Sequence, residues 1–384
     1  MQLLNGKVRA YPWGSRTMLA ELRGTPSPSE RPEAELWFGA HPAAPSEVAG
    51  TPLTEIIAAD PTAALGERVL REHGQSLPFL LKLLAADEPL SLQAHPSAAQ
   101  AREGYAREDA EGIALTAPHR DYKDVNPKPE LIVALTDFTA MAGFRPLEQT
   151  RELFAALECE ALDRYLTMLD DRVDAEEANL RALFTTWITI PGKVRRELID
   201  AIVAAATPLR GREDWIGRTL RNVVYLNERY PGDVGVLGAL LLNHIQLEPG
   251  EAIYLDAGQL HAYIRGLGVE VMANSDNVLR GGLTSKYVDV PELVRVLDFN
   301  SLADPVVAQV AGEYPVPANE FRLTRVSPTE DYEIEHDGPA VALCTRGTLQ
   351  FGELELGPGE AVWIPASDPA VTVRGGGELF LARG

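Results

Sequence analysis

Four side chains from three distant segments have the chemistry to hold one divalent metal ion. Gln93 and His95 lie two residues apart, Glu130 follows a proline-rich turn, and His261 closes the segment Gly258–His261. Two imidazoles, one carboxylate and one amide oxygen suit a borderline cation such as Zn2+. If these side chains meet, the sequence predicts an enzyme with one Lewis-acid metal ion per chain.

Each of these residues also has an ordinary structural explanation. Gln93 and His95 share one face of a predicted strand together with Ser91, so His95 could be a buried histidine that hydrogen-bonds its neighbouring glutamine. Glu130 follows a proline, where a glutamate is usually solvated. His261 ends the spacing Gly-x5-Asp-x-Gly-x2-His, which resembles the second cupin motif of small β-barrels and jelly rolls. Taken singly, the residues leave a metal site and a structural role both open.

The elements that would position these residues are mostly strands. Residues 1–145 are predicted to form strands and turns, with one helix at about Ala98–Ala110. Residues 146–234 change to helical periodicity, and from Leu247 the chain returns to strands. Phe321–Arg383 is predicted to consist of short strands with glycine turns. The helical positions are Leu153, Leu157, Ala161, Tyr165 and Leu169, then Val194, Leu198, Ile202 and Ala206, and a further helix at Trp215–Leu226.

One stretch of the sequence occurs twice. Pro249–Ala257 (PGEAIYLDA) parallels Pro358–Ala366 (PGEAVWIPA), and in this alignment His261 corresponds to Ala370. Only the first copy therefore keeps a metal ligand. We predict a mainly β protein with an α insertion, built from two cupin-like jelly rolls and a helical domain. The predicted division is a metal-binding jelly roll at 1–145 and 235–297, a helical insertion at 146–234 and a degenerate jelly roll at 298–384.

Longer motifs resemble the type I mannose-6-phosphate isomerases over almost the whole chain. In order they are Tyr11–Ser15, Ala34–Pro42, Pro78–Lys82, Leu90–Pro96, Tyr122–Asp124 leading to Lys128–Glu130, and Asn274–Lys286. The resemblance implies cupin-like jelly rolls with a helical insertion, and a zinc-dependent interconversion of mannose 6-phosphate and fructose 6-phosphate. It also implies that Gln93, His95, Glu130 and His261 bind the zinc and that Arg280 is catalytic.

One position departs from the family pattern. Many members have Asn-His-Lys-Pro-Glu where this chain has Pro127 within Asn126–Glu130. A mechanism that uses this histidine as its base cannot operate here, whereas none of the four metal positions is affected.

Aldose–ketose isomerisation moves a proton between C2 and C1 through an enediol, so the site needs a base and a positive charge. Arg280 would stabilise the enediolate, unless it forms a salt bridge with Asp276. Lys128 lies two residues before Glu130. Beside a bound cation the pKa of its ammonium would fall, so that the neutral amine could act as the base. The alternative is a surface lysine in a proline turn. Glu270, an acid within an apolar strand, is the second candidate for the base, and a hydrogen-bonded structural role is its alternative.

The remaining candidates would bind the substrate. Lys82, Lys286 and Arg280 are the cations available for a phosphate in an otherwise acidic chain, with Ser91 as a hydroxyl donor. Lys82 is the only charge in its apolar run, so its partner is either the phosphate or a buried acid. We expect three further residues in the sugar pocket, although the two aromatic ones also suit the core: Asp276, Trp13 and Tyr263.

Bulk properties restrict the possible partners. The net charge of -21 argues against nucleic acid and anionic membranes. Apolar runs are too short to cross a membrane, no signal-peptide pattern is visible, and the two cysteines, Cys159 and Cys344, are not predicted to pair. We therefore expect a soluble cytoplasmic monomer that acts on a small sugar phosphate. An Fe(II) cupin dioxygenase and a non-catalytic sugar-binding cupin are the alternatives, although Gln93 as a fourth ligand argues against the dioxygenase.

Overall fold

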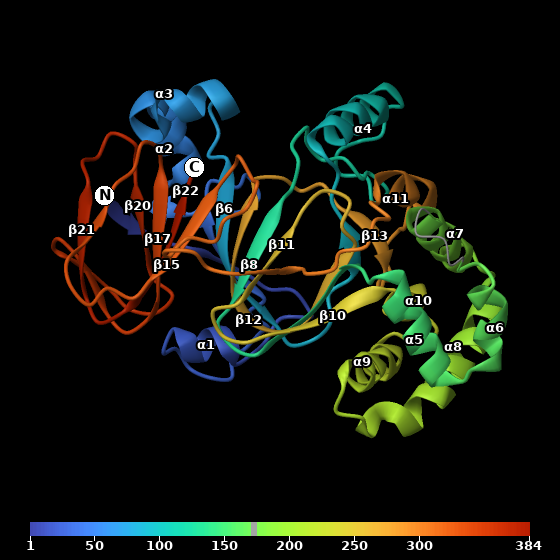
Figure 1. Ribbon diagram of the computed structural model, residues 1–384. Coiled ribbons are helices and arrows are strands. Elements are labelled where there is room, and N and C mark those ends of the chain that lie inside the picture. Colours follow the sequence, from blue (N-terminus) through green and yellow to red (C-terminus); the bar gives the residue numbers. More distant parts are fainter. Residues whose placement is uncertain (170–174) are drawn as a thin grey trace.

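The computed structural model describes residues 1–169 and 175–384, and it confirms a mainly β protein with inserted helices (Figure 1). The larger sandwich has two layers that share one long strand, β12 (His261–Ala273). In spatial order, the first layer contains β14 (Val306–Val307), β11 (Ala252–Leu255), β8 (Glu130–Ala134), β12, β6 (Phe79–Ala86), β3 (Glu35–Gly39) and β2 (Lys7–Arg9). The second layer contains β10 (Leu242–Leu247), β9 (Phe138–Phe144), β12, β7 (Leu92–Ala94) and β13 (Leu279–Gly282).

Strand β12 passes from one layer to the other at Gly266. Its first residues pair with β9 and β7, whereas the residues from Gly266 onward pair with β6 and β8. Gly266 has a φ of 133°, and a Cβ atom there would lie 2.6 Å from the ring of Phe138. Glycine is therefore required at this bend, which joins the two layers through one continuous backbone.

Both layers of the larger sandwich are covered on their outer faces. The first layer packs against the second sandwich through Leu36, Leu81, Leu131 and Val269 on one side and Val341, Leu343, Trp363 and Phe380 on the other. The second layer packs against the helices through Leu92, Ala94, Met141, Ala262 and Leu279. Burial on both faces explains why β6 is buried at every position rather than at alternate ones.

The second sandwich confirms the predicted run of short strands at the C-terminal end. One sheet has the order β1 (Gln2–Leu4), β20 (Ala361–Ile364), β17 (Ala340–Arg346), β22 (Glu378–Arg383) and β15 (Arg322–Val326). The other has the order β16 (Tyr332–Ile334), β21 (Val371–Gly375), β18 (Leu349–Phe351) and β19 (Leu354–Leu356). A small two-stranded sheet is formed by β4 (Glu47–Val48) and β5 (Thr51–Pro52).

The N-terminal strand corrects one boundary of the predicted domain division. Strand β1 pairs with β20, with Leu3 opposite Val362, so residues 2–4 belong to the second sandwich rather than to the first (Figure 1). This pairing was not visible in the sequence because the two strands lie at opposite ends of the chain. The rest of the division stays a prediction.

The two copies of the repeated sequence form the same turn with the same hydrogen bonds. Gly250 and Gly359 have φ values of 97° and 82°. In the first copy the amide of Gly250 donates to the carbonyl of Ala134 at 2.8 Å. In the second copy the amide of Gly359 donates to the carbonyl of Cys344, also at 2.8 Å. The strands that follow, β11 and β20, lie at corresponding places in the two sandwiches. The structure thus supports a shared origin for the two strand units.

The helices were predicted only in part. The predicted helix α4 (Ala98–Ala110) is present and begins at a capping box of Ser97 and Gln100. The predicted face running from Leu153 to Leu169 is divided, because Glu158 adopts a left-handed conformation between α5 and α6. Three helices in residues 1–145 were missed: α1 (Met18–Leu22), α2 (Leu53–Ala59) and α3 (Pro61–His73). The others are α5 (Leu147–Leu157), α6 (Glu160–Leu166), α7 (Glu176–Ile188), α8 (Gly192–Ala206), the 3-10 helix η2 (Thr207–Gly211), α9 (Trp215–Arg229), α10 (Val234–Gly238) and α11 (Val290–Val296).

Two further expectations can be compared with the structure. Cys159 and Cys344 are both free and buried, so the expectation that they do not pair is confirmed. Within the described ranges, no helix combines the length and the apolar composition needed to cross a membrane.

A candidate metal centre inside the larger sandwich

The pairing of three strands places the predicted site residues in one row. Strand β7 lies between β12 and β13, with Gln93 opposite His261 on one side and opposite Arg280 on the other. Residues that face each other in adjacent strands point to the same side of a sheet, and His95 is two residues beyond Gln93. The intervening residues, such as Leu92 and Ala94, are packed under the helices. The alternation therefore directs the polar side chains to the interior of the sandwich.

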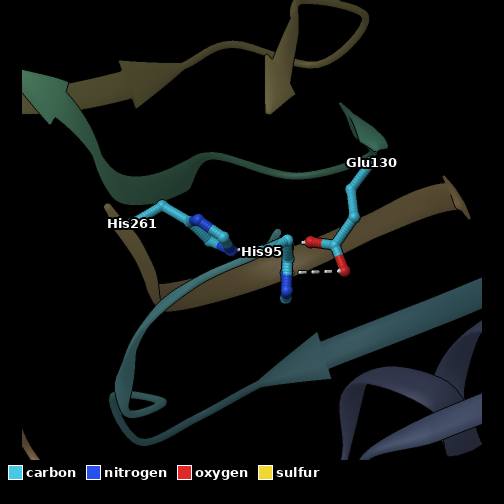
Figure 2. Close-up of side chains that lie close together, drawn as sticks. All are labelled: His95, Glu130 and His261. Carbon is cyan, nitrogen blue, oxygen red and sulfur yellow. Dashed lines mark ion pairs between the residues drawn. The ribbon is translucent and has the colours of Figure 1, made fainter. Parts of the chain in front are cut away.

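Three of the four predicted ligands meet there. The Nε2 atom of His95 lies 3.2 Å from Oε1 of Glu130, and Nε2 of His261 lies 3.6 Å from Oε2 of the same carboxylate (Figure 2). The potential ligand atoms of the three residues lie within 4.8 Å of one another, and all three side chains are buried. Glu130 reaches this point because it opens β8 in the opposite layer, where it faces Met272 of β12.

The donor atoms are arranged as a metal site requires. Nδ1 of His95 lies 2.9 Å from the carbonyl of Asn277, and Nδ1 of His261 lies 2.9 Å from that of Gln259. Each ring therefore donates from Nδ1 and turns the lone pair of Nε2 to the interior. Both Nε2 atoms and Oε2 of Glu130 are buried without a hydrogen-bond partner. Buried polar atoms are rarely left in this state, so their convergence fits a cation between them.

The protonation states of these groups agree with this interpretation. Burial, aided by the positive charge of Lys128, lowers the pKa of His95 to about 4. Burial alone would raise the pKa of Glu130, but Lys128 and His95 together hold it well below its usual range. At neutral pH His95 is thus neutral and Glu130 ionised, which are the forms that bind metals.

The fourth predicted ligand, Gln93, is half-buried and lies beside His261 in the sheet. The register brings its side chain to the same face as the three clustered ligands. Its coordination of a metal stays a prediction.

Lys128, the leading candidate for the base, lies next to the metal group. Its ammonium is 2.9 Å from Oε1 of Glu130, and 10% of its side chain is exposed. The alternative of a surface lysine in a proline turn therefore does not hold. Lys128 approaches Glu130 because the segment before β8 is extended, so the side chains of Lys128 and Glu130 both point inward.

Lys82 and Glu270 form a buried ion pair rather than separate functional groups. Oε2 of Glu270 lies 2.9 Å from the Lys82 ammonium, and Glu35 approaches the same ammonium to 3.5 Å. The remaining oxygen of Glu270 accepts a hydrogen bond from the Tyr263 hydroxyl at 3.0 Å. Although burial acts to lower the pKa of Lys82, the charges of Glu270 and Glu35 raise it. The partner of Lys82 is thus a pair of buried acids, one of the two possibilities left open by the sequence.

Arg280 lies opposite Gln93 in the neighbouring strand β13. It is half-buried, and no salt bridge to Asp276 is formed, so that alternative does not hold among the described residues. Burial lowers the pKa of Lys286, and the charge of Arg280 lowers it further. Burial also lowers the pKa of Lys123, and the charge of Arg280 contributes to this decrease. The Lys123 ammonium also donates to the carbonyls of Leu115 and Ala117, at 2.8 and 3.3 Å.

The other predicted residues are distributed around these two groups. Ser91 and Trp13 are half-buried, and Trp13 packs against the interior cluster that contains Tyr263. Tyr263 is almost fully buried and hydrogen-bonded to Glu270, so it serves the core. Asp276 is 55% exposed and lies 3.3 Å from His41.

A cleft of about 1230 Å3 is lined by Pro127 and Asp276. Their chain neighbours Lys128 and Asn277 contact Glu130 and His95. The cleft runs between the larger sandwich and the second one, and both His41 and Asp276 line it, as do Lys123 and the C-terminal Gly384. Sequence reasoning assigned no role to His41 or Lys123, although both lie in quoted motifs. Their positions became apparent only when the strands were paired.

Comparisons with known proteins agree with this architecture. A family model described as the catalytic domain of type I phosphomannose isomerase matches residues 1–147. The mannose-6-phosphate isomerase of Escherichia coli (strain K12) is 40% identical, with 99% of this chain and 98% of that protein covered. The mannose-6-phosphate isomerase of Homo sapiens is 30% identical, with 98% and 92% covered.

Solved structures give the same result. A crystal structure of a mannose 6-phosphate isomerase bound with zinc and yttrium has a TM-score of 0.88 at 36% identity, and covers 100% of this chain and 98% of that one. A variant of the phosphomannose isomerase from Salmonella typhimurium has a TM-score of 0.90 at 36% identity, with the same coverage.

Proposed function

The chain belongs to the type I mannose-6-phosphate isomerase family, and from this premise we propose that it interconverts mannose 6-phosphate and fructose 6-phosphate with the aid of zinc. One observation carries the proposal. Three buried donor atoms, Nε2 of His95, Nε2 of His261 and Oε2 of Glu130, converge without hydrogen-bond partners. Two imidazoles and a carboxylate are a frequent ligand set for catalytic zinc. We propose Gln93 as the fourth ligand.

The bound cation would supply a positive centre that favours negative charge on the sugar oxygens. The protein contributes a site from which water is largely excluded, since His95, Glu130 and His261 are all buried. Arg280 adds a permanent positive charge on the same face of the sheet as Gln93 and His261. A preorganised cation at this point would stabilise the enediolate that forms when the C2 proton leaves.

We assign the transfer of the proton between C2 and C1 to Lys128. Its amine lies 2.9 Å from Glu130, at the edge of the metal group, and is therefore close to any sugar held there. Glu270 is less suited, because one of its oxygens contacts Lys82 and the other accepts the Tyr263 hydroxyl. Both oxygens of Glu270 are already engaged. Lys128, whose ammonium pairs with Glu130, must lose its proton before it acts as the base.

The substrate would lie with its phosphate at one end of the site and its sugar at the other. Arg280 and Lys286 are the cations proposed for the phosphate, and Lys123 is a third. Ser91, Trp13 and Asp276 are proposed to contact the sugar, because all three are partly accessible. Lys82 and Tyr263, also predicted to bind substrate, are buried against Glu270 and are assigned to holding the interior in place.

A coupled assay for fructose 6-phosphate formation tests the proposal. The purified protein should convert mannose 6-phosphate, lose this activity on chelation and regain it with zinc. Elemental analysis should find one zinc ion per chain. A protein that binds iron and consumes oxygen would support the dioxygenase alternative, and one that binds the sugar phosphate without converting it would support the non-catalytic alternative.

We further propose that the enzyme works in the cytoplasm as a monomer. The unpaired, buried cysteines support a reducing compartment. The net charge of -21 keeps like chains apart at low ionic strength and disfavours nucleic acid as a partner. Analytical ultracentrifugation of the zinc-loaded protein tests the oligomeric state.

A further inference from the structure

His41 and Asp276 form a hydrogen-bonded pair that the function proposed above does not explain. Nε2 of His41 lies 3.3 Å from Oδ1 of Asp276. The histidine side chain is 4% exposed, whereas the aspartate side chain is 55% exposed. A buried histidine is thus bound to a carboxylate at the wall of the large cleft.

The local fold determines the orientation of His41. Buried strand β3 ends at Gly39, and His41 begins a turn in which the amide of Ala44 donates to the His41 carbonyl at 3.1 Å. The amide of Ala43 donates to Nδ1 of His41 at 3.2 Å. Because Nδ1 is an acceptor, Nε2 carries the ring proton and donates it to Asp276. The ring also packs edge-on against Trp37, with the ring centroids 4.9 Å apart.

Asp276 is held equally firmly from its own side. Its backbone amide donates to Oδ2 of Asp124 at 2.8 Å, and the neighbouring Ser275 hydroxyl donates to Oδ1 of Asp124 at 2.8 Å. Within the described residues, Oδ2 of Asp276 accepts no hydrogen bond. One carboxylate oxygen is therefore fixed by His41, and the other is available to a ligand.

The position of Asp276 connects the cleft with the metal centre. The hydrogen bond from His41 holds the pKa of Asp276 below its usual range, and the charges of Lys128 and Lys82 contribute to this. The next residue, Asn277, also contacts the metal centre, because its carbonyl lies 2.9 Å from Nδ1 of His95. The carboxylate thus lies on the cleft wall, one residue away from a group that contacts His95.

We propose that His41 is a positioning residue, which holds the free oxygen of Asp276 toward a hydroxyl group of the sugar as it enters the metal centre. This inference rests on the proposed isomerase function and adds to it a role for the Ala34–Pro42 motif, which no predicted site residue occupies. His41 contacts no reacting atom; it acts through Asp276. A fixed carboxylate oxygen at this rim accepts a hydrogen bond from the substrate without first losing conformational freedom.

Two substitutions of similar polarity separate positioning from simple packing. Glutamine carries its amide nitrogen near the place of the histidine Nε2, so His41→Gln keeps the donor to Asp276. Asparagine carries it near the place of Nδ1, so His41→Asn loses that donor. We expect kcat/KM for mannose 6-phosphate to fall about 10-fold or more in His41→Asn, the scale of a hydrogen bond to a charged group. His41→Gln should stay within about 3-fold of the wild type, with the same zinc content.

A matched control and a double variant complete the experiment. His73 lines the same cleft, its Nε2 has no hydrogen-bond partner, and His73→Asn should leave kcat/KM unchanged. In an Asp276→Asn background, His41→Asn should cause little further loss, because its effect acts through the missing carboxylate. Equal activity of the Gln and Asn variants, or an undiminished loss in that background, would overturn the proposal. Absence of isomerase activity in the wild type would instead overturn the proposed function.

Discussion

Replacing Lys82 with methionine would show whether this lysine serves the fold or the substrate. Its ammonium lies 2.9 Å from Glu270 and 3.5 Å from Glu35, and the three side chains are 7%, 3% and 9% exposed. The substitution leaves two buried carboxylates without their cation, and breaking a buried ion pair in this way costs about 3–5 kcal/mol. With an unfolding entropy of roughly 2.1 cal/mol/K per residue over 384 residues, this cost corresponds to a decrease in Tm of about 4–6 °C.

Scanning calorimetry of the zinc-loaded proteins measures the effect. The double variant Lys82→Met, Glu270→Gln should regain about half of the lost stability, because the closer of the two unpaired charges is gone. The loss should be smaller at pH 5 than at pH 7. Burial raises the pKa of Glu270, and loss of Lys82 removes the charge that lowers it. The folded state therefore binds a proton at Glu270 as the pH falls, and it regains stability.

The opposite outcome would refute this reasoning. If Lys82→Met keeps its Tm at pH 7 and raises only the KM for mannose 6-phosphate, then Lys82 binds the phosphate as first expected. The control is Lys193→Met, which removes a lysine whose side chain is 85% exposed and which should leave both Tm and KM unchanged.

Three further predictions concern the site. Alanine at His95 or His261 should remove bound zinc and activity together. Gln93→Ala should weaken zinc binding less, because an amide oxygen is the poorest donor of the four. Full zinc occupancy in His261→Ala would contradict the assignment. Arg280→Lys should lower kcat on the order of 10²-fold, since it keeps the charge but loses the planar fork; an unchanged kcat with a raised KM would make Arg280 a phosphate ligand only. Lys128→Met should retain zinc but stop exchange of the C2 proton with solvent, and normal exchange would transfer the role of base to Glu270.

The grouping of the candidate metal ligands could be predicted in part, because strand periodicity determines the face of each residue. The spacing of Gln93 and His95 put both on one side, and the glycine pattern before His261 marked a strand start. Glu130 was different, since a glutamate after a proline carries no such signal by itself. Only the resemblance to a family connected it to the two histidines, and the structure then brought all three together.

Partners across strands could not be predicted in the same way. Lys82 was recognisable as a buried charge, but its neighbour Glu270 follows from the register of β6 and β12. The same holds for His41, whose partner Asp276 is brought near by two loops that share no local pattern. A single sequence determines which side chains are buried far better than it determines which of them meet.

Some helices were missed because their signals were short or interrupted. Helix α3 begins at Pro61, with one residue between it and the end of α2, and Gly66 breaks the helical dihedrals within α3, so the apolar pattern never extended far enough to be recognised. The opposite error occurred at Glu158, where the apolar positions continue in phase although the backbone turns. Periodicity reports the buried face, and it is not sensitive to a break that preserves this face.

The pairing of β1 with β20 has a consequence for synthesis of the chain on the ribosome. The edge strand β1 is made before the larger sandwich and the helices, yet the strand β20 that it must join is made after them. During elongation Gln2–Leu4 therefore remain unpaired while the larger sandwich and the helices form. Contacts between distant parts of a chain are slow to close, so completion of the second sandwich must follow release of the C-terminal strands. A bulky fusion ahead of Met1 would delay that final closure while leaving the metal centre free to assemble.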